Sequence, residues 1–435
     1  AQKIEAFDSS FDNLDKRTQR IDIGDLNIAL LPKQTRGETV TVCMKFKSGD
    51  EKNLFGKANL QPVAAAMLTR GTKTMTRSEI EDRMTELKMA GSITNFTTTR
   101  KNLPAALELV FDVMHNSIMP QDEFDQFKKQ MQVMIESMRD KPDALAQNAI
   151  TQHFNTYPKG DPRHEYSLDE SLEQLNRLTV DQVRAFYKEF GGTSRGEISI
   201  VGDFDPKAVE KIIRDDYAKY VSKAHYAPIV TEYRPVQATR VVIDTPDKEN
   251  ATIVARSVFP INDTSPDAPA LTVANWILGG GTGLSNRLIE RLRQKEGLSY
   301  GAGSHVRIPA KGDNGSFVFR AIVAPQNMLQ AEASARDVIA KAIKDGFTDQ
   351  EVEEAKKGLL QAMQVARSQD DVVARSWNDK MENQRTWVFS KKQAEAISKL
   401  TTADVNAALR KYIKPDEITF VLAGDQKKAA QKKQD

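Results

Sequence analysis

Apolar and polar residues follow two periods along this chain, which predicts a protein that mixes strands and helices. Alternate apolar positions from Phe317 to Val323 predict a strand, because successive side chains of a strand point to opposite faces. Apolar runs predict further strands at 28–31, 40–46, 198–201, 241–244, 252–259 and 418–422. Runs 28–31 and 40–46 are predicted to pair as a hairpin, as are runs 241–244 and 252–259.

Capping signals predict where helices begin and end. Thr76 with Glu79, and Thr348 with Glu351, have the spacing of a capping box. Gly346 is suited to end the helix that precedes the second box. Because strands and helices do not alternate strictly, the pattern favours an α+β fold with antiparallel or mixed sheets covered by helices.

Two long helical stretches are predicted, over about 121–155 and 348–384. Pro142 is expected to break the first, because proline lacks an N–H and clashes with the preceding turn.

The chain contains an internal repeat. One block recurs 210 positions later, with Gly71-Thr72, Arg77, Arg83 and Gly91 matching Gly281-Thr282, Arg287, Arg293 and Gly301. A second block recurs 222 positions later, with Leu178-Thr179, Val183 and Gly202-Asp203 matching Leu400-Thr401, Val405 and Gly424-Asp425. Two blocks in the same order predict one duplicated domain. A proline-containing stretch over 222–237 predicts the linker, and hence domains at 1–225 and 226–435.

Composition excludes several classes of function. The net charge of +2 gives no reason to expect nucleic acid, and no apolar run approaches the ~18 residues of a membrane span. Cys43 is the single cysteine, which excludes an intrachain disulfide and a thiolate metal cluster, and its apolar surroundings predict a buried thiol. The start at Ala1-Gln2 favours an exported, periplasmic mature form, although a cytoplasmic protein fits the cysteine content equally well.

The segment 292–301, Leu-Arg-Gln-Lys-Glu-Gly-Leu-Ser-Tyr-Gly, holds the main candidate site. Gly297 is suited to close a helix, and a strand is predicted from Tyr300 to Ile308. Arg293 and Tyr300 would then lie on either side of this turn and could face one cleft. Two donors aimed at one point can bind a peptide carbonyl or a developing oxyanion. The alternative is a helix-capping arginine and a half-buried tyrosine.

Together with Gly281-Thr282 and Arg287-Leu288, this segment resembles the C-terminal half of M16 (pitrilysin/insulinase) zinc peptidases. The resemblance implies that Arg293 and Tyr300 contact substrate, with a weaker backbone contact at Gly280, Gly281 and Thr282. The run Gly279–Gly283 lacks the endings of phosphate-binding and dinucleotide-binding loops and is interpreted as a flexible turn.

The zinc-binding half of the family's chemistry is missing from the sequence. The resemblance places the inverted H-x-x-E-H motif of the family at Pro62, Ala65 and Ala66, none of which can coordinate a metal. Glu136 is near the position of the third ligand, but one carboxylate does not hold zinc usefully, and a solvated or salt-bridged residue is expected. The histidines at 115, 153, 164, 225 and 305 are expected on the surface or in loops, with a dispersed metal site left open.

These features imply the substrate-binding, non-zinc subunit of a heterodimeric M16 peptidase. Its partner would be an M16 subunit that carries zinc and the glutamate base, and its substrate would be a peptide. Two alternatives are a non-catalytic M16-like scaffold and a stand-alone peptide-binding protein.

Overall fold

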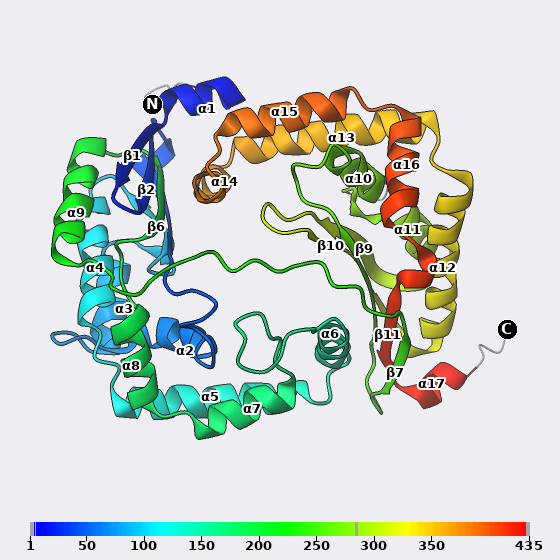
Figure 1. The fold of residues 1–435 in the computed structure, drawn as a ribbon, viewed down its shortest axis with the longest axis horizontal. Helices are drawn as coiled ribbons and strands as arrows, with labels where there is room; N and C mark the ends of the chain where they lie inside the picture. The colour runs from blue at the N-terminus through cyan, green and yellow to red at the C-terminus, as the bar shows by residue number, and fades with distance from the viewer. Residues whose placement is uncertain (1–3, 5, 283–285, 432–435) are drawn as a thin grey trace.

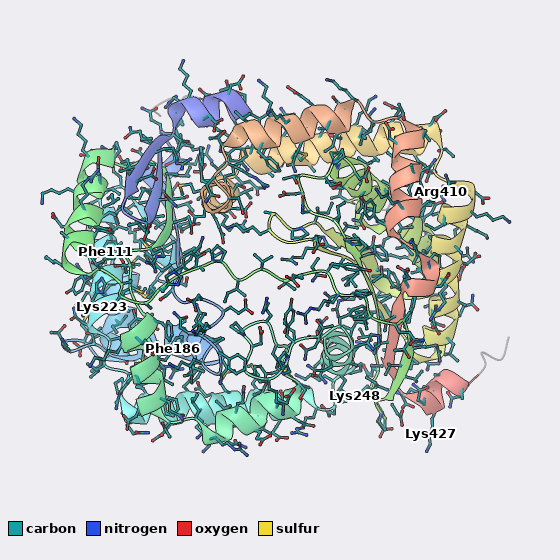
Figure 2. All side chains as sticks on the ribbon, in the orientation of Figure 1. Phe111, Phe186, Lys223, Lys248, Arg410 and Lys427 are labelled. Carbon is teal, nitrogen blue, oxygen red and sulfur yellow. The ribbon has the colours of Figure 1, made fainter. Side chains whose placement is uncertain are left out.

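A computed structural model describes residues 4, 6–282 and 286–431, and it shows two sheets joined by an extended linker. The sheets lie on opposite sides of the molecule, and residues 220–239 cross between them without forming a helix or strand (Figure 1). Side chains from both halves and from this linker project into the space between the sheets (Figure 2). The mixed sheets covered by helices confirm the α+β prediction.

The first sheet contains six strands among the described residues, in the order β1-β2-β6-β3-β5-β4. Their bounds are β1 Gln19–Ile23, β2 Leu26–Pro32, β3 Thr39–Phe46, β4 Ala90–Gly91, β5 Asn95–Thr99 and β6 Gly196–Gly202. The predicted hairpin of β2 with β3 is wrong, because β6 lies between them, parallel to β2 and antiparallel to β3. Every residue of β6 is buried, as expected of a central strand that is paired on both edges.

The second sheet repeats this arrangement with five described strands, in the order β7-β11-β8-β10-β9. Their bounds are β7 Arg240–Asp244, β8 Ala251–Pro260, β9 Ser299–Arg307, β10 Asn314–Val323 and β11 Thr419–Gly424. The predicted hairpin of β7 with β8 is also wrong, because β11 is inserted between them. The strand predicted over 317–323 is confirmed within β10.

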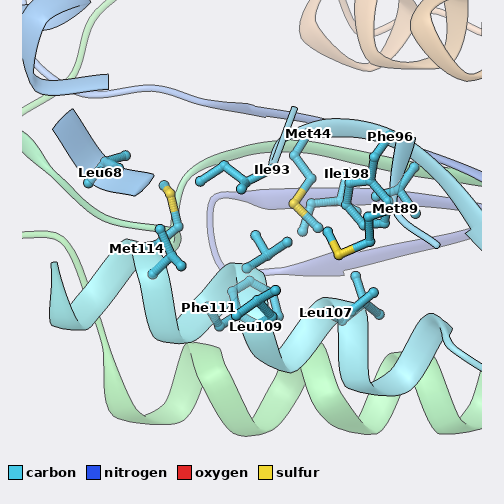
Figure 3. Packing of buried hydrophobic residues seen from close by; sticks show 14 of the residues in the cluster. Met44, Leu68, Met89, Ile93, Phe96, Leu107, Leu109, Phe111, Met114 and Ile198 are labelled. Carbon is cyan, nitrogen blue, oxygen red and sulfur yellow. The ribbon is translucent and has the colours of Figure 1, made fainter. Parts of the chain in front are cut away.

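Helices of each half cover one face of its own sheet. In the first half, α2 Leu60–Met67, α3 Arg77–Glu86, α4 Leu103–Asn116, α8 Val180–Phe190 and α9 Pro206–Lys219 contribute to this core. Met44, Phe96 and Ile198 from the strands face Leu107 and neighbouring residues of α4 (Figure 3). In the second half, α10 Ala268–Asn275, α11 Arg287–Ile289, α12 Met328–Asp345, α13 Asp349–Arg367 and α16 Thr402–Tyr412 contribute to the equivalent core.

The other face of each sheet is covered by a helix from the opposite half. Helix α6, Pro142–His153, packs its buried Ala146 and Ile150 on β8 and β11 of the second sheet. Helix α14, Asp370–Glu382, packs on β3 and β6 of the first sheet. The two halves therefore exchange one helix each, which ties them together by apolar burial.

The remaining α-helices lie outside these two sets. They are α1 Phe11–Arg17, α5 Gln121–Met138, α7 Leu168–Arg177, α15 Trp387–Ser398 and the C-terminal α17 Gln426–Ala430. The predicted break at Pro142 is confirmed between α5 and α6. The stretch 348–384 is also broken, at Ser368 and Gln369, because α14 must turn to reach the other sheet. None of the described helices is both long and apolar enough to cross a bilayer.

The internal repeat is visible as a duplicated ion pair. Arg77 at the start of α3 pairs with Glu123 at 3.1 Å, and Arg287 at the start of α11 pairs with Glu351 at 2.7 Å. Each pair joins the helix after the Gly-Thr turn to a longer helix of the same half. Both predicted capping boxes are also confirmed, as is the end of α12 at Gly346, whose φ of 77° suits glycine.

Candidate functional site

The turn between Arg293 and Tyr300 is built from a short π-helix, a glycine and a strand. The π-helix η4 covers Glu290–Lys295, and Gly297 follows it with a φ of 58°. This positive φ confirms the prediction that Gly297 ends the helix. The Leu298 N–H donates to the Leu292 carbonyl at 2.7 Å, and both leucines are buried, so the turn is closed against the core of the second half.

A β-bulge places Tyr300 on the surface. Ser299 pairs with Val323 and Gly301 pairs with Ile322, which leaves Tyr300 as the extra residue on β9. The Ser299 Oγ donates to the carbonyls of Gly301 at 2.7 Å and of Ile322 at 3.0 Å. Its oxygen accepts from the Gly301 N–H at 3.1 Å. The bulge is therefore held by a buried hydroxyl, and the Tyr300 side chain is 65% exposed rather than half-buried.

Arg293 is also exposed, and it lies on η4 next to the fully buried Leu292. Its guanidinium has no ion pair or hydrogen bond within the described part of the chain, so it is not the helix-capping arginine of the alternative interpretation. Arg293 and Tyr300 both leave their donors available to a second molecule.

A group of charged residues anchors this turn to α12. Arg291 binds Glu296 and also Asp337, the latter at 2.9 Å, and the Ser334 hydroxyl donates to Glu296 at 2.7 Å. Burial alone would raise the pKa of Glu296, but the hydrogen bonds from Arg291 and Ser334 outweigh it and lower that pKa. The sequence analysis missed these residues and Ser299, because their partners are distant in the chain or are backbone atoms.

The glycine-rich turn is more enclosed than predicted. The π-helix η3, Trp276–Gly280, leads into Gly281, which is buried and donates its N–H to the Trp276 carbonyl at 2.9 Å. A Cβ on Gly280 would lie 2.5 Å from the Asn275 Nδ2, so a larger residue there would displace the Asn275 side chain. Thr282 is exposed. Gly283, the end of the predicted flexible turn, lies outside the described residues.

The positions that match the family's zinc motif lie on α2. Pro62 and Ala65 are exposed and Ala66 is partly buried; Ala65 and Ala66 line a mainly apolar cavity of about 550 Å³. These side chains offer no nitrogen, oxygen or sulfur ligand, so the site does not fit zinc. Glu136 is exposed and pairs with Arg139 at 3.1 Å. Across the described residues, no group of three His, Cys, Asp or Glu side chains is placed to hold a metal.

His115 was expected on the surface or in a loop, but it lies inside the protein. Its side chain is buried, binds Asp216 at 2.9 Å and stacks on Tyr220, because α4, α9 and the start of the linker meet there. His164 is buried as well, and its Nδ1 lies 2.7 Å from the Tyr157 carbonyl. Both are therefore structural residues rather than surface histidines.

Sequence comparison connects this architecture to known proteins. Residues 177–359, which include Arg293 and Tyr300, match the family model described as "Peptidase M16 inactive domain". An "Uncharacterized zinc protease" from Mycobacterium tuberculosis is 24% identical over 299 residues, which covers 66% of each chain. The "Non-peptidase homolog YmxG" from Helicobacter pylori is 23% identical over 185 residues, or 42% of this chain and 41% of that protein.

Solved structures share the whole fold. A structure described as a peptidase M16 inactive domain from Pseudomonas fluorescens has a TM-score of 0.79 at 20% identity, and covers 94% of this chain and 97% of that one. A protease from Helicobacter pylori has a TM-score of 0.77 at 18% identity, covering 94% and 99%. Residues 177–359 are therefore similar in sequence to the M16 inactive domain, and the chain as a whole shares the fold of these solved structures.

Proposed function

We propose that this chain is the substrate-binding, non-zinc subunit of a heterodimeric M16 peptidase. In this proposal Arg293 and Tyr300 hold peptide carbonyls of the substrate. A partner M16 subunit contributes the zinc centre, which supplies the activated water, and the glutamate base.

One observation carries the proposal: Tyr300 is forced outward by a bulge that the buried Ser299 hydroxyl stabilises. The exposed Tyr300 side chain is therefore accessible to a second molecule. Arg293 is also exposed, and its turn is fastened to α12 through Arg291 and Glu296. Donors fixed in this way can bind a substrate with little reorganisation.

The chemistry follows from the donor groups. The Tyr300 hydroxyl donates one hydrogen bond, and the planar Arg293 guanidinium carries several N–H donors. Both can bind a peptide carbonyl oxygen, and their bonds strengthen when that oxygen gains negative charge in the tetrahedral intermediate. The subunit would then both position the peptide and stabilise the transition state.

The matches to relatives also concern the alternative function, a non-catalytic scaffold. The relative described as a non-peptidase homolog favours a chain without its own hydrolytic centre, and a non-catalytic scaffold is the second candidate. A scaffold has no requirement for the tyrosine hydroxyl, so the two functions differ in one measurable property.

The test is co-expression with a zinc-carrying M16 partner, followed by a peptidase assay with and without a chelator. Tyr300→Phe should lower turnover by about 100-fold or more, because a donor to the developing oxyanion is removed. The complex should still assemble, as measured by light scattering. Tyr220→Phe is a matched control, because Tyr220 is 39% exposed and lies at the start of the linker, away from the Arg293 and Tyr300 turn. Unchanged turnover by the combined Tyr300→Phe and Arg293→Ala variant would contradict the catalytic role and favour the scaffold.

A further inference from the structure

A second polar site lies between the two halves. A cavity of about 490 Å³ is bounded by α6 and the loop after it, by the linker, and by the second sheet. Four arginines line it, at positions 163, 234, 256 and 307. The proposed function does not use any of these residues.

Arg256 forms the inner part of this cavity. Arg256 is two residues after Val254 on β8, so the two side chains point to the same face of the sheet. That face is covered by α6, not by the core of the second half. Its guanidinium lies over the Phe154 ring, 4.9 Å from the ring centre. The Arg256 Nε is buried and has no hydrogen-bond partner among the described residues. Burial without such a partner also lowers the pKa of Arg256.

Two of the other arginines are already held in place. Arg163 binds Asp161 at 2.9 Å and Glu51 at 2.5 Å, so its charge is compensated. Arg234 donates to the Thr156 carbonyl at 3.0 Å and stacks on Tyr157. These two residues form fixed walls of the cavity.

Arg307 lies at the end of β9 and is exposed. Within the described part of the chain it makes no ion pair. Arg256 on the floor of the cavity and Arg307 at its rim therefore have N–H donors that no described residue occupies.

The charges around the cavity limit the kinds of ligand that it can bind. Glu165 and Glu232 also line the cavity, and Arg163 is already paired with Asp161 and Glu51, which lie outside the lining. The guanidiniums at 234, 256 and 307 favour an anion of low charge, whereas a polyphosphate would be repelled by the two glutamates. A planar carboxylate also matches the paired donors of a guanidinium.

We propose that Arg256 and Arg307 bind a carboxylate of a peptide substrate, so that this subunit prefers peptides with an acidic residue. The inference rests on the proposed function, because the ligand is the same peptide. Strand β9 is the edge of the second sheet and contains both Tyr300 and Arg307. Seven residues of strand cover about 23 Å. The acidic residue would therefore lie about seven positions from the peptide bond at Tyr300.

The test uses the purified chain alone and pairs of fluorescent, C-terminally amidated 14-residue peptides that differ only by Glu or Gln at one scanned position. The Glu peptide should bind about 10-fold more tightly at one position or at two adjacent positions. This difference should disappear in Arg256→Gln and shrink in Arg307→Gln. A Gln peptide with a free C-terminal carboxylate separates a chain end from a side chain as the source.

Arg177→Gln is the matched control, since Arg177 is an exposed helix residue with 79% side-chain exposure. If Arg256→Gln does not fold, Arg307→Gln still tests the proposal, because Arg307 is exposed and its substitution should not disturb folding. Equal affinities for the Glu and Gln peptides, no measurable binding of either, or a preference that survives both substitutions would overturn the proposal. Displacement by triphosphate at lower concentration than by acetate would also overturn it, in favour of a polyanion site.

The two proposals can fail separately. The combined Tyr300→Phe and Arg293→Ala variant should weaken the binding of the Glu peptide and of the Gln peptide by the same factor. The preference for the carboxylate would then be preserved. If the wild-type chain shows no preference for the Glu peptide but turnover in the heterodimer depends on Tyr300 as proposed, only the carboxylate site is overturned.

Discussion

The indole N–H of Trp377 donates to the hydroxyl of Thr18 at 3.1 Å, and this buried bond joins the two halves of the chain. Trp377 belongs to α14 of the second half and is 1% exposed, whereas Thr18 precedes β1 of the first half. The ring of Trp377 also packs edge-to-face on Trp387. The contact shows that α14 is part of the core of the first sheet rather than a surface helix.

Replacing this tryptophan tests the helix exchange. Trp377→Ala should lower the free energy of unfolding by about 3–5 kcal/mol, because it removes a large buried side chain and leaves a cavity. Urea denaturation of the full chain measures the change. Val388→Ala, at a residue with 47% exposure, should change it by about 0.5 kcal/mol or less. A small effect of Trp377→Ala would mean that α14 does not contribute to stability.

The lone cysteine reports on the same interface. Burial raises the pKa of the Cys43 thiol to about 11, and Asn378 of α14 donates to the Cys43 carbonyl at 3.1 Å. Native protein at pH 8 should therefore react with a thiol reagent only when α14 opens, because the thiolate is the reactive form. Trp377→Ala should accelerate this labelling, whereas Val388→Ala should not. Rapid labelling of the native wild-type chain would contradict the buried position.

Acid should weaken the contact between the halves through Glu382. Its carboxylate binds Lys45 at 2.9 Å and Lys47 at 3.1 Å of the first sheet. Burial alone would raise the pKa of Glu382, but the hydrogen bond from Lys45 and the charges of both lysines outweigh it and lower that pKa below 4.5. Because the folded pKa is lowered, the stabilisation is present above the unfolded pKa and is lost as pH falls through the folded pKa.

The stability difference between wild type and Glu382→Gln should therefore be largest near pH 7 and vanish once the pH falls below the folded pKa of Glu382. Urea unfolding at several pH values measures it. The nearby Glu197 binds Lys47 at 2.6 Å, but burial raises its pKa, so its contribution has the opposite slope. Taking the difference between the two proteins limits the effect of Glu197. A difference that is constant with pH would contradict the assignment to Glu382.

Ser299→Ala tests the bulge that exposes Tyr300. The substitution removes a hydroxyl whose single O–H is shared between two carbonyls, and it should cost about 1–3 kcal/mol of stability. Under the proposed function, peptidase turnover with a zinc-carrying partner should also fall, because the Tyr300 ring is no longer fixed. Ser299→Thr, which keeps the hydroxyl, should restore part of both properties. Normal turnover in a destabilised Ser299→Ala protein would show that the bulge does not position Tyr300.

Much of the local structure was predictable because it depends on neighbours in the chain. The capping boxes at Thr76 and Thr348, the break at Pro142 and the turn at Gly297 follow from backbone geometry within a few residues. The Arg293 and Tyr300 candidates also came from a local pattern. Strand pairing was not predictable in this way, because β6 and β11 reach their central places from distant parts of the chain.

By itself, the sequence determined the α+β class and the internal repeat, because these depend on residue type and spacing. The resemblance to M16 peptidases added the Arg293/Tyr300 segment and the expectation that Pro62, Ala65 and Ala66 stand where the zinc ligands would be. Only the tertiary structure decided that α6 and α14 are exchanged between the halves, that a bulge exposes Tyr300, and that four arginines surround one cavity. Each of these requires segments that are far apart in the chain to meet, and packing of the whole molecule determines those contacts.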